Sequence, residues 1–196
     1  MNDDALAQQA KWDARYRDSS VQEAQPAFVL RGYAHLLPAH GRALDLASGL
    51  GGNALFLAQH GLTTEAWDIS SVAVEKLGDF ARQHRLPMVA QVRDVCAAPP
   101  AAASFDVIVV THFLERSLAP LLVDALRPQG LLFYQTFTTA RIDDTGPPAG
   151  PYRLEDNELL TLFRDLRLRA YREELLLGDL KAGWRGEALL VGQKSP

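Results

Sequence analysis

Apolar and polar positions follow one another along this chain in blocks of different period, and the blocks predict strands separated by helices. Residues 107–110 form a continuous apolar run, and residues 43–46 are apolar except for Asp45; both runs are too short for helices, which indicates buried strands. Three further segments are expected to be strands, at residues 63–68, 88–92 and 131–137. Apolar helical stripes lie between or after them, at residues 53–60, 71–81, 118–126 and 159–163. A turn is expected at residues 127–130 (R-P-Q-G), before the strand at residues 131–137. Strands alternating with helices predict an α/β fold built on a parallel sheet.

The two ends of the chain depart from this alternation. A helix is expected over residues 5–17, and a second apolar helical stripe (Val29, Tyr33 and Leu36) follows Pro26. We therefore expect a helical cap over residues 1–40 that belongs to the same domain as a core over residues 41–196. Near the other end, residues 166–177 and 187–193 read as adjoining strands with no helix between them, which predicts an antiparallel pair. The expected fold is a single-domain, doubly wound, seven-stranded, mostly parallel sheet with an antiparallel last strand.

The most informative stretch, residues 42–61, reads as a strand, a glycine turn and a helix. Residues 49–52 hold three glycines in four positions, which lets a ligand approach the backbone without a Cβ between them. The helix that follows offers N–H groups that have no partner within the helix. Asp45 stands at the end of the strand, and a buried carboxylate needs a partner because an unpaired buried charge is costly. We expect a cationic group of a ligand to be that partner.

The segment D-L-A-S-G-L-G-G-N resembles motif I of the class I S-adenosylmethionine-dependent methyltransferases, which share a Rossmann-like fold. Asp45, Gly49 and Gly51 match the acid and the alternate glycines, whereas Ala47 stands where the first glycine of the motif often lies. The resemblance implies that this loop holds the methionine end of S-adenosyl-L-methionine. The cofactor residues it implies here are Asp45, Ala47, Ser48, Gly49, Gly51 and Asn53.

Two further segments resemble cofactor contacts of the same family. Asp68, followed by Ile69, ends the second predicted strand, where a carboxylate is suited to accept both ribose hydroxyls. Asp68 as an acid beside the next helix dipole is the alternative. The segment R-D-V resembles the adenine-binding turn, in which Asp94 would accept the adenine amine and the backbone near Val95 would meet a ring nitrogen. Asp94 as an ordinary turn residue is the alternative.

The segment W-D-A-R-Y resembles the W-D-x-x-Y element of small-molecule methyltransferases of the tellurite-resistance and thiopurine types. In those types the leading helices cover the cofactor and shape the acceptor pocket. The resemblance implies that Trp12 and Arg15 contact the cofactor and that Tyr16 contacts the acceptor. Simple helix packing by the two aromatic residues, with a solvated arginine, is the alternative.

The carboxyl end of the strand over residues 107–110 is the expected place for chemistry, because doubly wound sheets bind ligands at that edge. Thr111 is expected beside the cofactor, and His112 is the candidate catalytic residue. A histidine that is merely hydrogen-bonded at a strand end is the alternative. Residues 136–150 form a long polar loop on the same edge, from which Arg141 would orient a small, soft or anionic acceptor such as a thiol or a chalcogen oxyanion.

Charge and composition narrow the range of possible binding partners and cellular locations. A net charge of −4 and a pI near 5.7 argue against nucleic acid as the main partner, since phosphate binding needs clustered Lys and Arg. Cys96 is the single cysteine, which excludes an internal disulfide and fits a reducing cytoplasm. The acidic start lacks the apolar run of a signal peptide, and no run is long enough to span a membrane. We expect a cytoplasmic monomer or homodimer that acts on a small molecule without metal.

Two other functions compete with methyl transfer. Gly49, Gly51 and Ala54 satisfy the G-x-G-x-x-G/A pattern of an NAD(P)-binding oxidoreductase, with Asp68 near the offset of its ribose-binding acid. Against this, Asp45 would repel a pyrophosphate, no Tyr-x-x-x-Lys pair occurs, and the predicted fold ends in an antiparallel pair. The second alternative is a non-catalytic S-adenosylmethionine-binding module, which turnover of the methyl donor would distinguish from an enzyme.

Overall fold

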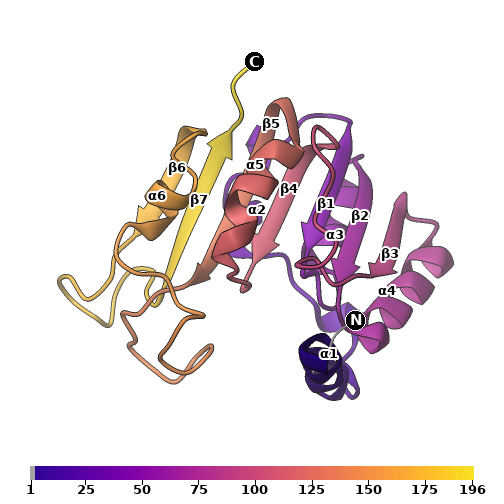
Figure 1. Cartoon of the computed structure of the whole chain (residues 1–196), viewed down its shortest axis with the longest axis horizontal. Coiled ribbons are helices and arrows are strands. Elements are labelled where there is room, and N and C mark those ends of the chain that lie inside the picture. The colour runs from indigo at the N-terminus through magenta and orange to yellow at the C-terminus, as the bar shows by residue number, and fades with distance from the viewer. Residues whose placement is uncertain (1–2) are drawn as a thin grey trace.

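A computed structural model describes residues 3–196; Met1 and Asn2, part of the predicted acidic start, lie outside the described residues. One sheet of seven strands has the order β3-β2-β1-β4-β5-β7-β6 (Figure 1). The strands are β1 (Arg42–Leu46), β2 (Thr63–Asp68), β3 (Met88–Val92), β4 (Phe105–Thr111), β5 (Leu126–Phe137), β6 (Arg167–Glu173) and β7 (Glu187–Gln193). All neighbours pair in parallel except β7, which is antiparallel to both β5 and β6. The predicted fold class is confirmed.

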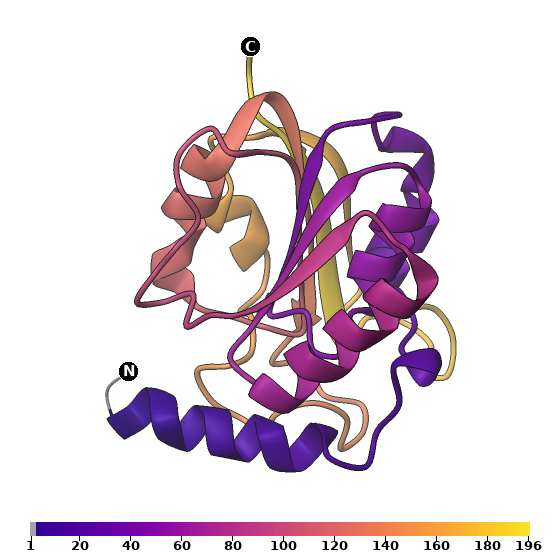
Figure 2. The ribbon, with the colours of Figure 1, turned by 90° about the vertical axis from the view of Figure 1, so that its right-hand side faces the viewer.

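Helices cover both faces of the sheet, as Figure 2 shows with the sheet seen from its side. The helices are α1 (Asp3–Tyr16), α2 (Phe28–Gly32), α3 (Gly52–Gln59), α4 (Ser71–His84), α5 (Ala119–Ala125) and α6 (Glu158–Leu162). Three short 3-10 turns are η1 (Val21–Glu23), η2 (Ala34–Leu36) and η3 (Arg116–Leu118). α5 and α6 pack on one face and α2, α3 and α4 on the other. Within residues 3–196, no helix is long and apolar enough to cross a membrane.

The central strand β4 shows why the continuous apolar run predicted a buried strand. Val107, Ile108, Val109 and Val110 are all fully buried. Successive side chains of a strand point to opposite faces, so Ile108 and Val110 join the core under α5, whereas Val107 and Val109 join the core under α2 and α3. Because both faces of β4 are covered, a ligand can approach this strand only at its ends.

Several predicted boundaries were wrong. β5 begins at Leu126 instead of residue 131, because the expected turn at residues 127–130 continues the strand through a bulge, with Gln129 at φ 67°. β6 ends at Glu173 instead of residue 177, and Leu175 beyond it has φ 46°. The stripe after Pro26 forms the short α2 and then η2, whereas the helix expected over residues 118–126 is confirmed as α5, which η3 precedes.

α1 lies beyond the carboxyl ends of β1 and β2, across the start of α4 (Figures 1 and 2). Asp13 accepts hydrogen bonds from Ser70 Oγ at 2.6 Å and from the Val72 N–H at 3.1 Å, at the positive end of the α4 dipole. Lys76 Nζ donates to carbonyl oxygens at the carboxyl end of α1, including that of Tyr16 at 2.9 Å. These opposite charges fix α1 on α4. The boundary at residue 40 between the helical cap and the core stays a prediction.

Candidate functional site

The glycine loop (residues 47–51) lies between β1 and α3 and has left-handed backbone at every second residue. The φ angles are 56° at Ala47, 52° at Gly49 and 78° at Gly51. Ala47 adopts this conformation at a cost of roughly 1–2 kcal/mol, which explains why glycine often stands at this position of the motif. Bonds within the protein hold this loop in place, since the Ser48 N–H donates to the Trp67 carbonyl at 3.0 Å and the Gly51 N–H donates to the Ser48 carbonyl at 2.8 Å.

Asp45 lies beneath this loop with no exposed surface. Its Oδ2 accepts the N–H of Ala54 at 3.0 Å, and its Oδ1 accepts a longer bond of 3.4 Å from Asn53 Nδ2. Burial raises the pKa of Asp45 to about 7, and these hydrogen bonds partly oppose the rise. The start of α3 therefore already supplies partners to the carboxylate, and a direct cationic ligand partner stays a prediction.

Asp68, at the end of β2, joins the glycine loop to the start of α4. Its Oδ2 accepts the Gly49 N–H at 2.7 Å and its Oδ1 accepts the Ser70 N–H at 2.8 Å. Burial raises the pKa of this carboxyl, and the two backbone bonds oppose it. Each oxygen retains a second lone pair after these bonds. Asp68 thus supports the local structure, and acceptance of ribose hydroxyls stays a prediction.

Tyr16 lies on the glycine loop, so the predicted acceptor residue contacts the cofactor side of the edge. A Cβ added to Gly49 would lie 2.6 Å from the Tyr16 hydroxyl oxygen, so that glycine is needed for packing within the protein as well. Burial, with a smaller effect of Asp68, raises the pKa of Tyr16 to about 12. Trp12 stacks on Tyr16 with ring centroids 5.8 Å apart, and Arg15 is exposed nearby. α1 therefore covers the loop through its aromatic residues.

The expected adenine-binding turn is occupied by local hydrogen bonds. Asp94 Oδ1 accepts the N–H groups of Cys96 at 3.0 Å and Ala97 at 3.2 Å, which is what a turn residue does. Val95 is buried in the core under α5, and Ile69 is partly buried after β2. Asp94 retains its second oxygen for a ligand, and adenine binding there stays a prediction.

A polar seam runs from the glycine loop across the carboxyl ends of β4 and β5 to the amino end of the reversed strand β7. Asn53 Nδ2 donates to Thr111 Oγ1 at 2.9 Å, which links the start of α3 to the end of β4. On β5, the amide oxygen of Gln135 accepts the Val29 N–H at 2.7 Å, and its Nε2 donates to Glu187 Oε2 at 2.5 Å. Because Gln135 is buried and its amide is bonded at both ends, it fixes the position of the Glu187 carboxylate.

His112 lies at the end of this seam. Its backbone is strained, and its ring is held in one orientation. Its φ is 55°, rare for a residue with a side chain, and its N–H donates to the Gln135 carbonyl at 2.9 Å. The imidazole Nε2 lies 3.1 Å from Glu187 Oε1, and the ring stacks on Phe137 with centroids 4.9 Å apart. The side chain is 45% exposed, so it is both held and accessible. Sequence reasoning missed Glu187 and Gln135 because only the pairing of β5 with β4 and with β7 brings these residues close to His112.

Arg141 lies in a small hollow beside the same carboxylate. This arginine hollow is lined by residues that include Phe137, Arg141, Ile142, Thr145, Arg153 and Glu187. Arg141 forms an ion pair with Asp144 at 2.9 Å. Since Phe137 and Glu187 also contact His112, the structure brings the predicted residues His112 and Arg141 to one place, apart from Tyr16. The loops that carry the hollow lie beyond the carboxyl end of β5 (Figure 1).

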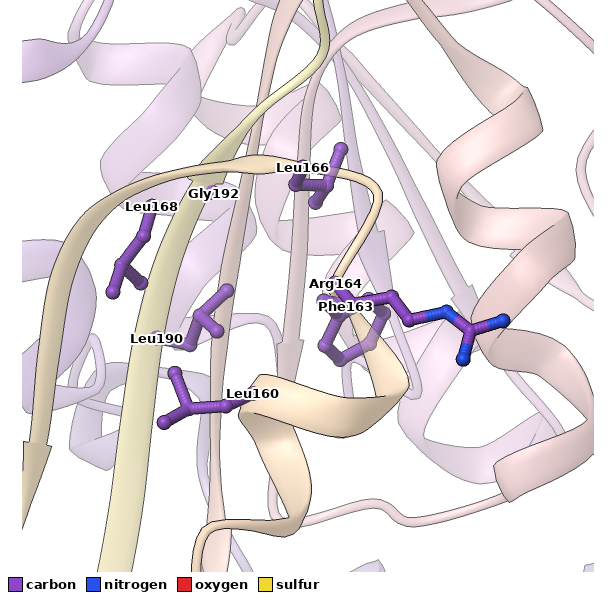
Figure 3. Close-up of a pocket in the computed structure, with 7 residues that line it drawn as sticks. All are labelled: Leu160, Phe163, Arg164, Leu166, Leu168, Leu190 and Gly192. Carbon is purple, nitrogen blue, oxygen red and sulfur yellow. The ribbon is translucent and has the colours of Figure 1, made fainter.

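A second hollow, shown in Figure 3, lies between α6 and the strands β6 and β7. Leu160, Phe163, Leu166 and Leu190 give it an apolar lining, and the side chain of Arg164 points away from them. Gly192, near the end of the reversed strand β7, and Leu168, near the start of β6, place it toward the amino ends of the parallel strands. It is therefore at the opposite end of the sheet from the glycine loop.

Comparison with known proteins identifies the family. The family model for the methyltransferase domain matches residues 17–175. The chain belongs to this family. The predicted recognition and the cofactor, S-adenosyl-L-methionine, are confirmed at this level.

One curated relative matches part of the sequence, and solved structures share the fold. Hemagglutinin 1 of Eikenella corrodens is 31% identical over 141 residues, which cover 67% of this chain and 46% of that protein. The chain thus spans about half the length of this curated relative. TehB of Haemophilus influenzae has 20% identity and a TM-score of 0.69 over 95% of this chain and 67% of its own. An S-adenosylmethionine-dependent methyltransferase of Mesorhizobium loti has 15% identity and a TM-score of 0.67 over 89% and 100%.

The residues of the glycine loop fit the cofactor of this family. Ser48 Oγ is buried, and no described group hydrogen-bonds to it. A buried polar atom without a partner is costly, and a polar group of the bound methionine end would supply one. Asp68 offers its remaining lone pairs beside Gly49, whose N–H it already accepts. Cofactor binding at this loop is therefore chemically consistent with the side chains present.

Proposed function

We propose that this methyltransferase transfers a methyl group from S-adenosyl-L-methionine to a small-molecule acceptor. One observation supports the proposal above the others: the polar seam joins two distinct half-sites along one sheet edge. The glycine loop, with the unpartnered Ser48 hydroxyl, suits the methionine end of the donor. The arginine hollow, with His112 at its border, suits an acceptor. Methyl transfer needs these two molecules held end to end.

In this proposal the cofactor half-site uses the residues expected from the family resemblance. The loop from Asp45 to Gly51, Asn53 and Thr111 would position the methionine end, and Asp68 with Ile69 would position the ribose. Asp94 and the backbone of Val95 would bind adenine. Trp12, Arg15 and Tyr16 would cover the cofactor, since α1 already lies over the loop. When bound, the sulfonium supplies an activated methyl group, so the protein contributes chiefly placement and exclusion of water.

A small acceptor is proposed because the edge is covered at both ends. α1 lies over β1 and β2, while the loops at residues 138–157 and 174–186 lie beyond β5 and β7 (Figure 1). The net charge of −4 disfavours a nucleic acid. A cytoplasmic location and a monomeric or homodimeric state complete the proposal, and the single cysteine supports the cytoplasmic location.

Thermal denaturation with four candidate ligands tests the cofactor half of the proposal. A ligand that binds only the folded chain adds about 2.7 kcal/mol at 100 times its Kd, so S-adenosylmethionine and S-adenosylhomocysteine should raise Tm. NAD and NADP should not, and a shift with them alone would establish the oxidoreductase alternative. Formation of S-adenosylhomocysteine with a panel of small thiols, phenols and carboxylates then tests turnover. Binding without turnover, or turnover only on RNA or protein, would contradict a small-molecule methyltransferase.

A further inference from the structure

A buried cation beside the arginine hollow indicates the charge of the molecule that the hollow binds. Arg153 is only 2% exposed, and its guanidinium donates to the carbonyl oxygens of Thr138, Thr145 and Pro147 at 2.6–2.8 Å. Among residues 3–196, no carboxylate forms an ion pair with Arg153. Its hydrogen bonds are satisfied, but its charge is only partly balanced, by Asp143, an exposed carboxylate that lines the same hollow. Asp143 stands there among three arginines, Arg141, Arg153 and Arg185. Because a buried charge that is not fully balanced is costly, the hollow favours an anion.

Arg141 supplies a donor that can reach such an anion. It lines the hollow, and its ion-pair partner Asp144 has a fully exposed carboxylate. An exposed ion pair contributes little to stability, so Arg141 exchanges this partner at little cost. The acidic side chain of the hollow nearest to His112, Glu187, has both oxygens engaged, one by His112 and one by Gln135. An anionic acceptor would therefore be held by Arg141, with Phe137 and Ile142 against its apolar part.

Glu187 also determines which nitrogen of His112 is available. An ionised carboxylate accepts hydrogen bonds only, so the bond to Oε1 requires the proton of the neutral imidazole to be on Nε2. The lone pair is then on Nδ1, and within the described chain no group hydrogen-bonds to Nδ1. Stacking on Phe137 and the bond to Glu187 prevent the ring from turning. This arrangement is suited to accepting a proton from a group bound beside Phe137.

We propose that the arginine hollow binds a small organic anion bearing a hydroxyl or thiol, and that His112 removes its proton while Glu187 positions the imidazole. The inference rests on the proposed function and specifies its acceptor. The proton of the hydroxyl or thiol passes to Nδ1, and the electron pair left on oxygen or sulfur forms the new bond to the methyl carbon. The bond between that carbon and the donor sulfur breaks with both electrons on sulfur. The imidazolium then returns its proton to water, which its exposed ring contacts.

The position of the imidazole proton tests the role of Glu187 on the chain alone, without cofactor. In ¹⁵N-histidine NMR spectra at neutral pH, wild-type His112 should give the Nε2–H tautomer, with Nδ1 unprotonated. Glu187→Gln should give a mixture of tautomers, whereas Glu65→Gln, a similarly buried ion-paired acid on β2, should leave the His112 signals unchanged. A wild-type Nδ1–H tautomer, or an unchanged tautomer in Glu187→Gln, would overturn the assignment. If Glu187→Gln does not fold, the wild-type tautomer decides alone.

The charge of the acceptor is tested by binding of matched probes to the chain alone. The pairs are 3-hydroxybenzoate with 3-hydroxybenzyl alcohol, and mercaptoacetate with 2-mercaptoethanol. At least one carboxylate should bind about 10-fold or more tightly than its neutral analogue, the range of one charge-assisted hydrogen bond. Arg141→Gln should abolish the preference, whereas Arg164→Gln, in the apolar hollow of Figure 3, should retain it. No preference in the wild type, or its survival in Arg141→Gln, would overturn the inference.

These two measurements separate this inference from the proposed function. Neither contains a methyl donor, so the tautomer and the anion preference can hold even if no methyl transfer is found. Conversely, turnover that prefers neutral acceptors and is unchanged in His112→Asn would confirm the methyltransferase and refute the acceptor class and the base. With the preferred carboxylate probe, His112→Asn should reduce kcat by about 10²–10⁴-fold while leaving the Kd of S-adenosylhomocysteine unchanged.

Discussion

Substitution of Asp45 by asparagine tests whether the motif carboxylate is buried at a cost in stability. The folded-state pKa of Asp45 is about 7, against an ordinary value of 3.8. The folded chain therefore binds more protons than the unfolded chain between these values, so stability falls as pH rises through this window. With 1.36 kcal/mol per pKa unit, the full penalty is about 4 kcal/mol, of which about 2–3 kcal/mol develops between about pH 5 and pH 8.

An asparagine side chain cannot ionise, so Asp45→Asn should lose this part of the pH dependence. The amide oxygen of the variant can still accept the Ala54 N–H, whereas its amide nitrogen faces Asn53 Nδ2 and the 3.4 Å bond is lost. That loss costs about 1 kcal/mol at every pH. The variant should therefore be slightly less stable than wild type near pH 4, and more stable than wild type near pH 8.

Urea denaturation at several pH values measures the effect as a difference between two curves. The free energy of unfolding of the variant minus that of wild type should rise by about 2–3 kcal/mol across the window. Asp79→Asn, which removes an exposed acid on α4, controls for the loss of one negative charge. Asp68, whose pKa burial also raises, is present in both chains, so only its electrostatic interaction with Asp45 contributes to the difference. Parallel curves would refute the account of Asp45.

Three further substitutions test the site. Asp68→Asn should weaken S-adenosylhomocysteine binding about 10-fold or more in calorimetry, since a charge-assisted hydrogen bond is lost. Equal affinity in wild type and variant would show that the role of Asp68 is purely structural. Lys76→Met should lower the free energy of unfolding by about 1 kcal/mol and increase amide exchange in α1, because it removes a cation from the end of that helix; unchanged exchange would contradict the contact. Gly49→Ala should destabilise the chain by about 1–3 kcal/mol, and Tyr16→Phe should recover part of that loss by removing the hydroxyl; strictly additive effects would refute the packing of Tyr16 on the loop.

The parts of the fold that were predictable from sequence are those set by local pattern. The β-branched run of β4 is buried on both faces, and the turn after β1 has the positive φ angles that glycine permits. The end of β5 was also correct, but its start was not, because Arg127, Pro128 and Gln129 read as a turn although they continue a bulged strand. A bulge depends on the partner strand, which a single segment does not contain.

The acceptor half of the site was less predictable because it depends on register and burial. His112 meets Glu187, 75 residues later, only because β5 pairs Thr111 with Gln135 on one side and Phe137 with Glu187 on the other. Arg153 stands in a polar stretch that reads as exposed, yet it is buried because three carbonyl oxygens of the same loop enclose it. The sequence predicted His112 and Arg141 as site residues, and their roles stay proposals. It carried no signal for Glu187, which contacts His112, or for Gln135, which contacts Glu187.

A crystal structure of the chain with S-adenosylhomocysteine tests the central claim most directly. The account predicts that the ribose hydroxyls lie within hydrogen-bond distance of Asp68, that the methionine end contacts Ser48 and Gly49, and that the sulfur faces the hollow bordered by His112 and Arg141. A nucleoside bound away from the glycine loop would contradict the cofactor assignment. A sulfur that faces away from this hollow would contradict the assignment of the acceptor site.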